Sequence, residues 1–253
     1  MSSASLTQVS RFSRMKEIVL LHGFAGTGRA WDPVVEQLDP ARYRSLTPDL
    51  RGHGARAALR PVSFDGCVRD VLATAPNAAF TLAGYSLGGR VALHVALAAP
   101  ERVGRLVLVA ATAGIEHPGE RAERAAADVA LAARAEHMEA DEFARLWQAQ
   151  PIFAGTPPAA AAAWSQDLRR TPPRHLAAVL RGIGTGAMEP LWPRLGELRM
   201  RCEVVVGERD AKFRVLGERL VSALPDARLH VVSRAGHGVP REAPAALAAI
   251  LAG

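Results

Sequence analysis

The sequence predicts an α/β fold, in which a mostly parallel central sheet carries helices on both faces and a helical cap is inserted. Short β-rich runs alternate with helical runs near both ends of the 253-residue chain, which is typical of βαβ units. Strand signals stop over residues 114–198, where Ala-rich helical stretches are broken by prolines. We therefore expect a core formed by residues 1–113 and 199–253, with residues 114–198 as the cap.

The expected elements follow from local patterns, taken in chain order. Apolar runs that end at Gly, Asp or a polar turn predict buried strands, and apolar residues at helical spacing predict the helices between them. The expected strands are residues 17–22, 43–48, 79–85, 105–110, 202–206 and 229–232. The expected helices outside the cap are residues 31–38, 64–75, 87–99, 215–224 and 243–251.

Composition excludes several classes of protein. Hydrophobic residues make up 49% and charged residues 22%, which favours a globular chain over a disordered one. No run of 18 apolar residues exists, so no membrane span is expected. Residues 1–14 contain two Arg but no apolar stretch and do not resemble a secretory signal; translation starting at Met15 is an alternative. Two distant cysteines, Cys67 and Cys202, fit a reducing compartment, so we expect a cytoplasmic protein.

The basic charge has two interpretations. The net charge is +6, and all but two of the 31 basic residues are Arg, the exceptions being Lys16 and Lys212. Genomic bias toward Arg codons explains most of this, and an anionic partner is the functional alternative. Because the Arg residues are scattered and aromatic residues make up only 5%, we expect no nucleic-acid binding.

A candidate nucleophile lies between an expected strand and an expected helix. Residues 84–88 read Gly-Tyr-Ser-Leu-Gly, the G-x-S-x-G pattern that holds a serine on a strained strand-to-helix turn. The turn would expose the hydroxyl of Ser86 at the edge of the sheet. The backbone N–H of Leu87, at the start of the helix, could donate to an oxyanion.

A matching acid and base follow in the chain. Asp210 comes after the strand expected at 202–206, and His237 after the strand expected at 229–232, so both lie at the same edge of the sheet as Ser86. His237 could accept the proton of Ser86 while Asp210 orients the imidazole. Glu208 is the nearest rival for the acid role.

These residues together resemble the α/β-hydrolase superfamily, from about residue 17 to residue 253 with the cap between. The resemblance implies that the N–H of Phe24, after the first strand, is the second oxyanion donor. His22 and His53, in the loops after the first two strands, are expected to be structural. The superfamily serves many reactions, so the triad alone does not specify one.

Further segments resemble one family within that superfamily. They are LHGF, DLRGHG, GYSLGGR, RAER, the WxxQPxFA block, LRGIGTG, GERDxKF and RAGH, and they span core and cap. The resemblance is to the MenH family, the 2-succinyl-6-hydroxy-2,4-cyclohexadiene-1-carboxylate synthases of menaquinone biosynthesis. It implies a lyase that eliminates pyruvate from an enolpyruvyl cyclohexene carboxylate, with the triad as general base and no cofactor or metal.

The same resemblance implies how an anionic polycarboxylate would be bound. Arg90 and Arg124 would hold substrate carboxylates, and Tyr85 and Trp147 would line the pocket. A further cap arginine is expected at Arg169, with Arg170 as a rival one residue along.

Lys212 matches a family lysine of less clear role.

The alternatives to the lyase are a carboxylesterase or C–C bond hydrolase on the same triad, and a non-catalytic binding protein. We expect a monomer or a small homo-oligomer.

Overall fold

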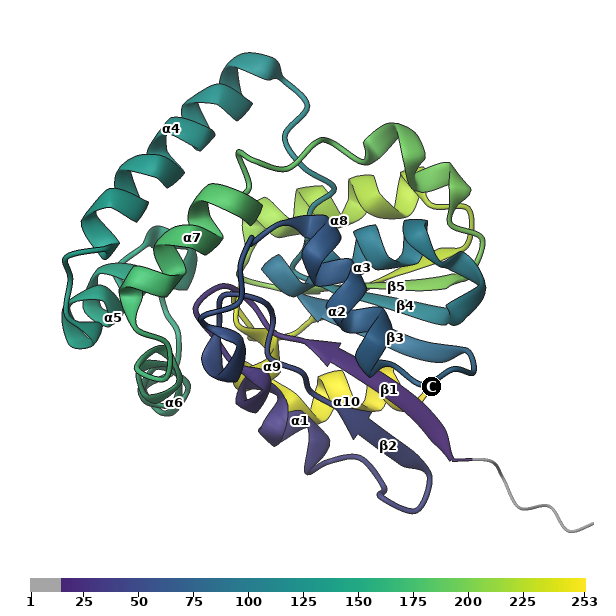
Figure 1. Cartoon of the computed structure of the whole chain (residues 1–253). Coiled ribbons are helices and arrows are strands. Elements are labelled where there is room, and N and C mark those ends of the chain that lie inside the picture. Colours follow the sequence, from purple (N-terminus) through teal and green to yellow (C-terminus); the bar gives the residue numbers. More distant parts are fainter. Residues whose placement is uncertain (1–14) are drawn as a thin grey trace, which may run out of the picture.

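The computed structural model describes residues 15–253, and its core is a single six-stranded sheet (Figure 1). All neighbouring strands are parallel, and their order across the sheet is β2-β1-β3-β4-β5-β6. The strands are β1 (Lys16–Leu21), β2 (Tyr43–Leu46), β3 (Phe80–Tyr85), β4 (Val103–Val109), β5 (Arg201–Gly207) and β6 (Ala227–Val232). The α/β fold class predicted from the sequence is therefore confirmed.

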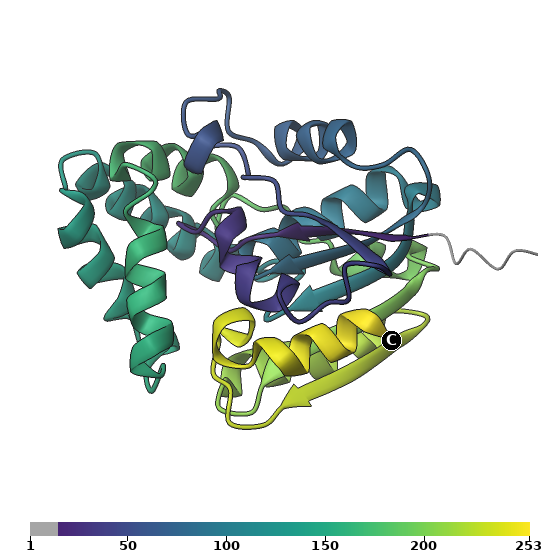
Figure 2. The same cartoon turned by 90° about the horizontal axis from the view of Figure 1, so that it is seen from below.

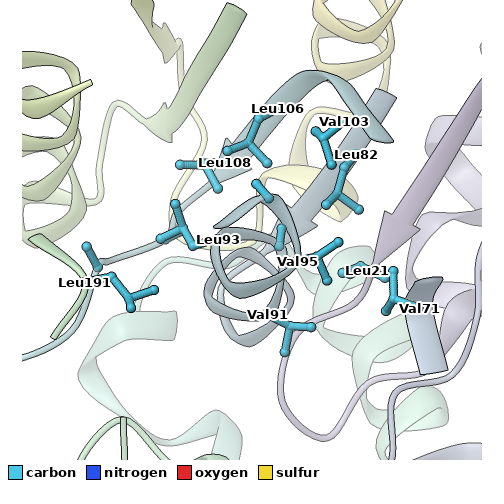
Figure 3. Packing of buried hydrophobic residues seen from close by; sticks show 14 of the residues in the cluster. Leu21, Val71, Leu82, Val91, Leu93, Val95, Val103, Leu106, Leu108 and Leu191 are labelled. Carbon is cyan, nitrogen blue, oxygen red and sulfur yellow. The ribbon is translucent and has the colours of Figure 1, made fainter. Parts of the chain in front are cut away.

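Helices cover both faces of the sheet, because successive strand residues point to opposite sides. In β4, Leu106 and Leu108 pack on one face and Val107 and Val109 on the other. Figure 2 shows α2 and α10 on opposite sides of the strands, and Figure 3 shows the Leu- and Val-rich packing around α3. The core helices are α1 (Asp32–Val35), α2 (Phe64–Thr74), α3 (Leu87–Ala98), α8 (Ala211–Ala223), α9 (Val239–Glu242) and α10 (Pro244–Ala252).

Four further helices lie between β4 and β5 in the chain and form a group beside the sheet (Figures 1 and 2). They pack through a small apolar cluster, which includes Phe143, Leu168 and Leu176 and is joined by Ala25 from the loop after β1. After Ile183 the chain returns to the core, where Trp192 and Leu195 join the packing of α3. The cap helices are α4 (Pro118–Ala135), α5 (Ala140–Gln148), α6 (Pro158–Leu168) and α7 (Pro173–Ile183).

Two expected helices differ from those observed. A 3₁₀ turn (Gly28–Trp31) leads into the single turn of α1, and Gln37 and Leu38 then form i→i+3 hydrogen bonds. The continuous helix expected over residues 31–38 is therefore wrong. Helix α8 begins at Ala211 rather than 215, because the side chain of Asp210 accepts a hydrogen bond from the N–H of Phe213 and caps the helix. The short helix α9 was not expected. The interpretation of residues 1–14 lies outside the described residues.

Within residues 15–253, none of the helices is long and apolar enough to cross a lipid bilayer.

Candidate active site

Ser86 sits on a strained turn between β3 and α3. Its φ is 52° and its ψ −108°, a backbone conformation that residues with a side chain rarely adopt. The turn is tight because glycines flank it: a Cβ on Gly84 would lie 2.2 Å from the carbonyl oxygen of Gly88. The backbone N–H of Ser86 donates to the carbonyl of Val109 on β4 at 2.8 Å. The sequence pattern thus produces a serine held rigidly at the carboxyl end of the sheet.

The structure brings Ser86, His237 and Asp210 together. His237 Nε2 lies 3.2 Å from Ser86 Oγ, and His237 Nδ1 lies 2.7 Å from Asp210 Oδ2. The imidazole is 3% exposed and Asp210 7% exposed, so bulk water does not compete for either hydrogen bond. In this arrangement the carboxylate can fix the Nδ1–H tautomer and leave Nε2 to accept the serine proton.

Glu208, the rival acid, points elsewhere. Its carboxylate accepts hydrogen bonds from the N–H of Arg234 at 2.7 Å and from the hydroxyl of Ser233 at 3.2 Å. These bonds lower the pKa of Glu208, the larger effect coming from the N–H of Arg234. Asp210 is therefore the carboxylate that contacts His237.

The loop after β1 carries Phe24, whose side chain lines the same cavity as Ser86. The residue after it, Ala25, has a φ of 59°, and its N–H donates to His53 Nε2 at 3.1 Å. The N–H of Leu87 is the first of α3 and has no acceptor within the helix. Phe24 therefore lines the cavity with Ser86, and Leu87 follows Ser86 directly as the first residue of α3.

His22 and His53 stabilise these loops as neutral imidazoles. His22 Nε2 accepts the N–H of Leu50 at 2.9 Å, and the two rings meet edge to face with centroids 4.9 Å apart. Burial lowers the pKa of His22, and burial lowers the pKa of His53 well below its ordinary value. Both are fully buried, as expected for structural residues.

A cavity of about 700 Å³ lies between the core and the cap. Aromatic rings surround the imidazole: Phe213, Tyr85 and Phe153 have ring centroids 4.6, 5.4 and 5.9 Å from that of His237. The volume suits a small organic ligand, and the rings exclude water from the base. The predicted residues that line it are Phe24, Tyr85, Ser86, Arg90, Arg124, Trp147, Lys212 and His237.

Two arginines give this cavity a positive region. Arg90 on α3 is 7% exposed and donates from Nη1 to the carbonyl of Ile183 at 2.7 Å, and it forms no ion pair with a carboxylate among residues 15–253. Burial, and then the charge of Arg124, lower the pKa of Arg90 to about 10. Arg124 on α4 donates from Nε to Asp128 at 2.8 Å. A buried guanidinium without a counter-ion favours an anionic ligand.

Arg169 does not reach the cavity. It directly follows the last residue of helix α6, and its guanidinium pairs with Asp141 of α5 while about half of the side chain is exposed. Arg170 lies near Asp167, with Nε 3.7 Å from Oδ1, and does not line the cavity either. The expectation that one of these two residues faces the pocket is wrong for this structure, because both side chains turn to acidic partners within the cap.

The sequence interpretation missed one basic residue of the cavity. Arg219 lines it from α8, two helical turns after Lys212 and on the same face of the helix. Its guanidinium lies 3.9 Å from the centroid of the Trp192 ring and pairs with Glu116. The seven-residue spacing from Lys212 was the available signal. In the part of the chain that the structure describes, no group of three metal-binding side chains occurs.

Comparison with known proteins gives consistent results. The chain matches the alpha/beta hydrolase family over residues 18–250. It is 34% identical over 238 residues to the 2-succinyl-6-hydroxy-2,4-cyclohexadiene-1-carboxylate synthase of Salmonella newport, covering 93% of this chain and 92% of that one. The structure of MenH from S. aureus superposes with a TM-score of 0.87 at 27% identity, covering 94% and 92% of the two chains. The enol-lactonase from Burkholderia xenovorans LB400 shares the fold, with a TM-score of 0.78 at 23% identity and coverage of 96% and 92%.

Proposed function

This chain belongs to the alpha/beta hydrolase family, and on that premise we propose that it is a 2-succinyl-6-hydroxy-2,4-cyclohexadiene-1-carboxylate synthase of menaquinone biosynthesis. It would eliminate pyruvate from the enolpyruvyl cyclohexene carboxylate that precedes this product. The observation that carries the proposal is the pairing of a Ser-His-Asp triad with a buried arginine that has no carboxylate partner among residues 15–253. An ester hydrolase needs the triad, whereas a polycarboxylate substrate also needs the cation.

In the proposed reaction the triad acts as a base. His237 takes the hydroxyl proton of Ser86, and the serine oxygen removes a proton from the substrate ring. The electrons of that C–H bond shift through the ring system, and the C–O bond to the enolpyruvyl group breaks. The group leaves as an enolate and becomes pyruvate when it takes up a proton. Ser86 forms no acyl-enzyme in this scheme.

Negative charge develops on the substrate carbonyl during proton removal. We assign the N–H groups of Phe24 and Leu87 to stabilise it, because Phe24 lines the cavity and the N–H of Leu87, next to Ser86, is the first of α3. Arg90 and Arg124 would hold substrate carboxylates, and Tyr85 and Trp147 would bound the space available to the ring. This arrangement keeps the anionic groups on the arginines while the ring proton faces the base.

Other features are consistent with this assignment. Lys212 lines the cavity from α8 and supplies a further positive charge for the anionic substrate. Cys67 and Cys202 are both free and buried, which fits the cytoplasmic location that we propose with the function. We also propose the core and cap boundaries of residues 113 and 199, and a monomer or small homo-oligomer, as the sequence predicts.

The test is pyruvate release from the enolpyruvyl substrate, made fresh by the preceding enzyme and followed with a lactate dehydrogenase couple. Wild-type protein should accelerate release, and Ser86→Ala should reduce turnover by orders of magnitude while the unfolding temperature stays within a few degrees. Release no faster than the blank would refute the lyase. Activated esters and C–C bond substrates would then be tested on the same triad.

A further inference from the structure

A buried carboxylate outside the triad binds the loop that carries His237. Glu242 lies on α9, five residues after the imidazole, and its side chain is 1% exposed. Its Oε2 accepts the N–H of Gly236 at 2.8 Å, and its Oε1 accepts the N–H of Gly238 at 3.0 Å. The two carboxylate oxygens therefore hold the peptide groups on both sides of His237.

The charge of this carboxylate is balanced by the neighbour of the triad acid. Arg209 precedes Asp210 and donates from Nη2 to Glu242 Oε2 at 2.8 Å. Its Nη1 donates to the carbonyl of Gly155 in the cap at 2.7 Å, and its backbone N–H donates to Ala235 in the histidine loop at 2.9 Å. The ion pair of Arg209 and Glu242 thus connects the loop after β5, which carries Asp210, with the loop that carries His237 and with the cap.

The loop needs such a restraint because glycine lies on both sides of His237. Glycine leaves the backbone more freedom than any other residue. The loop is also closely packed, since a Cβ on Gly238 would lie 2.8 Å from the Trp164 ring and 3.0 Å from Glu242 Oε1. A displacement of about 0.5 Å away from Ser86 would lengthen the 3.2 Å contact between His237 Nε2 and Ser86 Oγ beyond hydrogen-bonding distance.

We propose that Glu242 is a positioning residue for the general base: its carboxylate holds the loop so that the imidazole faces Ser86 and Asp210 together. This inference rests on the proposed triad and not on the identity of the substrate. Glu242 does not line the cavity, so it would act through the loop that carries His237.

The first test is Glu242→Gln, which keeps the shape of the side chain but offers one acceptor and an NH₂ group where two acceptors stood. We expect kcat for pyruvate release to fall about 10- to 100-fold, because small displacements of a reacting group have effects of that size. KM should change less than about threefold, because the arginines that bind substrate are untouched. The matched control is Glu197→Gln, which alters an exposed carboxylate that pairs with Arg194 away from the loop of His237 and should leave both constants near wild type.

A double-mutant cycle separates positioning from general damage. If Glu242 acts through His237, then Glu242→Gln should change the residual rate of His237→Ala less than about twofold. A loss of the same size in both backgrounds would overturn the proposal, because the effect would not pass through the imidazole.

A spectroscopic measurement makes the result independent of the substrate. The ring ¹⁵N and ¹H signals of His237, assigned with His237→Ala, should move in Glu242→Gln and remain in place in Glu197→Gln. Unchanged signals in folded Glu242→Gln would contradict the proposal even if the protein proved not to release pyruvate. Should Glu242→Gln fail to fold, Arg209→Gln removes the counter-ion from a half-exposed position and should move the same signals. Unchanged signals there would refute it.

Discussion

Replacing Arg90 by Met separates a binding role from a structural one, because the two predict opposite effects on stability. The lowering of the Arg90 pKa from 12.5 to about 10 by burial corresponds to a charge penalty of about 3 kcal/mol in the folded state. The folded chain holds this proton less tightly than the unfolded chain, so the penalty is present at neutral pH and declines only above about pH 10. Met removes the penalty and keeps much of the side-chain volume.

The substitution also removes one hydrogen bond. Losing the 2.7 Å bond to the carbonyl of Ile183 offsets about 1–3 kcal/mol of the gain. The free energy of unfolding of Arg90→Met should therefore equal or exceed that of wild type by up to about 2 kcal/mol, and the unfolding temperature should be unchanged or higher. Activity should move the other way. A lost charge-assisted bond to a carboxylate is worth about 1.5–3 kcal/mol, or about a 10- to 150-fold loss in kcat/KM.

Two assays check this prediction on the same preparations. Chemical denaturation gives the free energy of unfolding, and the pyruvate-release assay gives kcat/KM. In addition, millimolar succinate or pyruvate should raise the unfolding temperature of wild type but not that of Arg90→Met, because only the wild type keeps the cation that binds them. A variant that is several degrees less stable and equally active would refute the reasoning.

Three other expectations follow from the same geometry. Arg124→Ala should lower kcat/KM about 10- to 100-fold through the lost charge, and unchanged steady-state kinetics would remove this residue from the site. Arg169→Ala should leave kcat/KM within about twofold, because its side chain pairs with Asp141 away from the cavity; a tenfold loss would mean that α6 moves during catalysis. Burial lowers the pKa of His53 below 6.5, so only the unfolded chain gains a proton there as pH falls, and the free energy of unfolding should decrease below about pH 6.5. Denaturation curves at pH 7.5 and 5.5 test this, and His53→Gln should weaken the dependence; equal slopes in both proteins would contradict the assignment.

The strand positions and the turn that holds Ser86 could be predicted because their signals are local. Each observed strand begins and ends within two residues of the expected range, since a buried parallel strand is a short apolar run bounded by turn residues. The G-x-S-x-G pattern predicted the turn because a Cβ at Gly84 would lie only 2.2 Å from the carbonyl oxygen of Gly88, so that position requires glycine. Ser86, Asp210 and His237 could be placed together because each follows a strand of a parallel sheet, at the same edge.

The cap could not be predicted to the same depth. Arg169 lies where α6 ends, and on a helix one residue of shift turns a side chain by about 100°. The local pattern did not fix that rotation, which depends on packing against α5. Glu242 was missed for a related reason: α9 is a single turn, too short for a periodic signal, and its carboxylate matters through contacts with a loop that the sequence does not reveal.

The central claim is that this triad removes a proton from an anionic substrate and does not mainly cleave esters. The most direct measurement compares, on one preparation, kcat/KM for pyruvate release with kcat/KM for hydrolysis of p-nitrophenyl acetate. We predict that pyruvate release is faster by several orders of magnitude and depends on Ser86 and Arg90, with no covalent adduct on Ser86 by intact mass during turnover. Efficient ester cleavage through an acyl-Ser86 intermediate, with pyruvate release at the rate of the blank, would contradict the account.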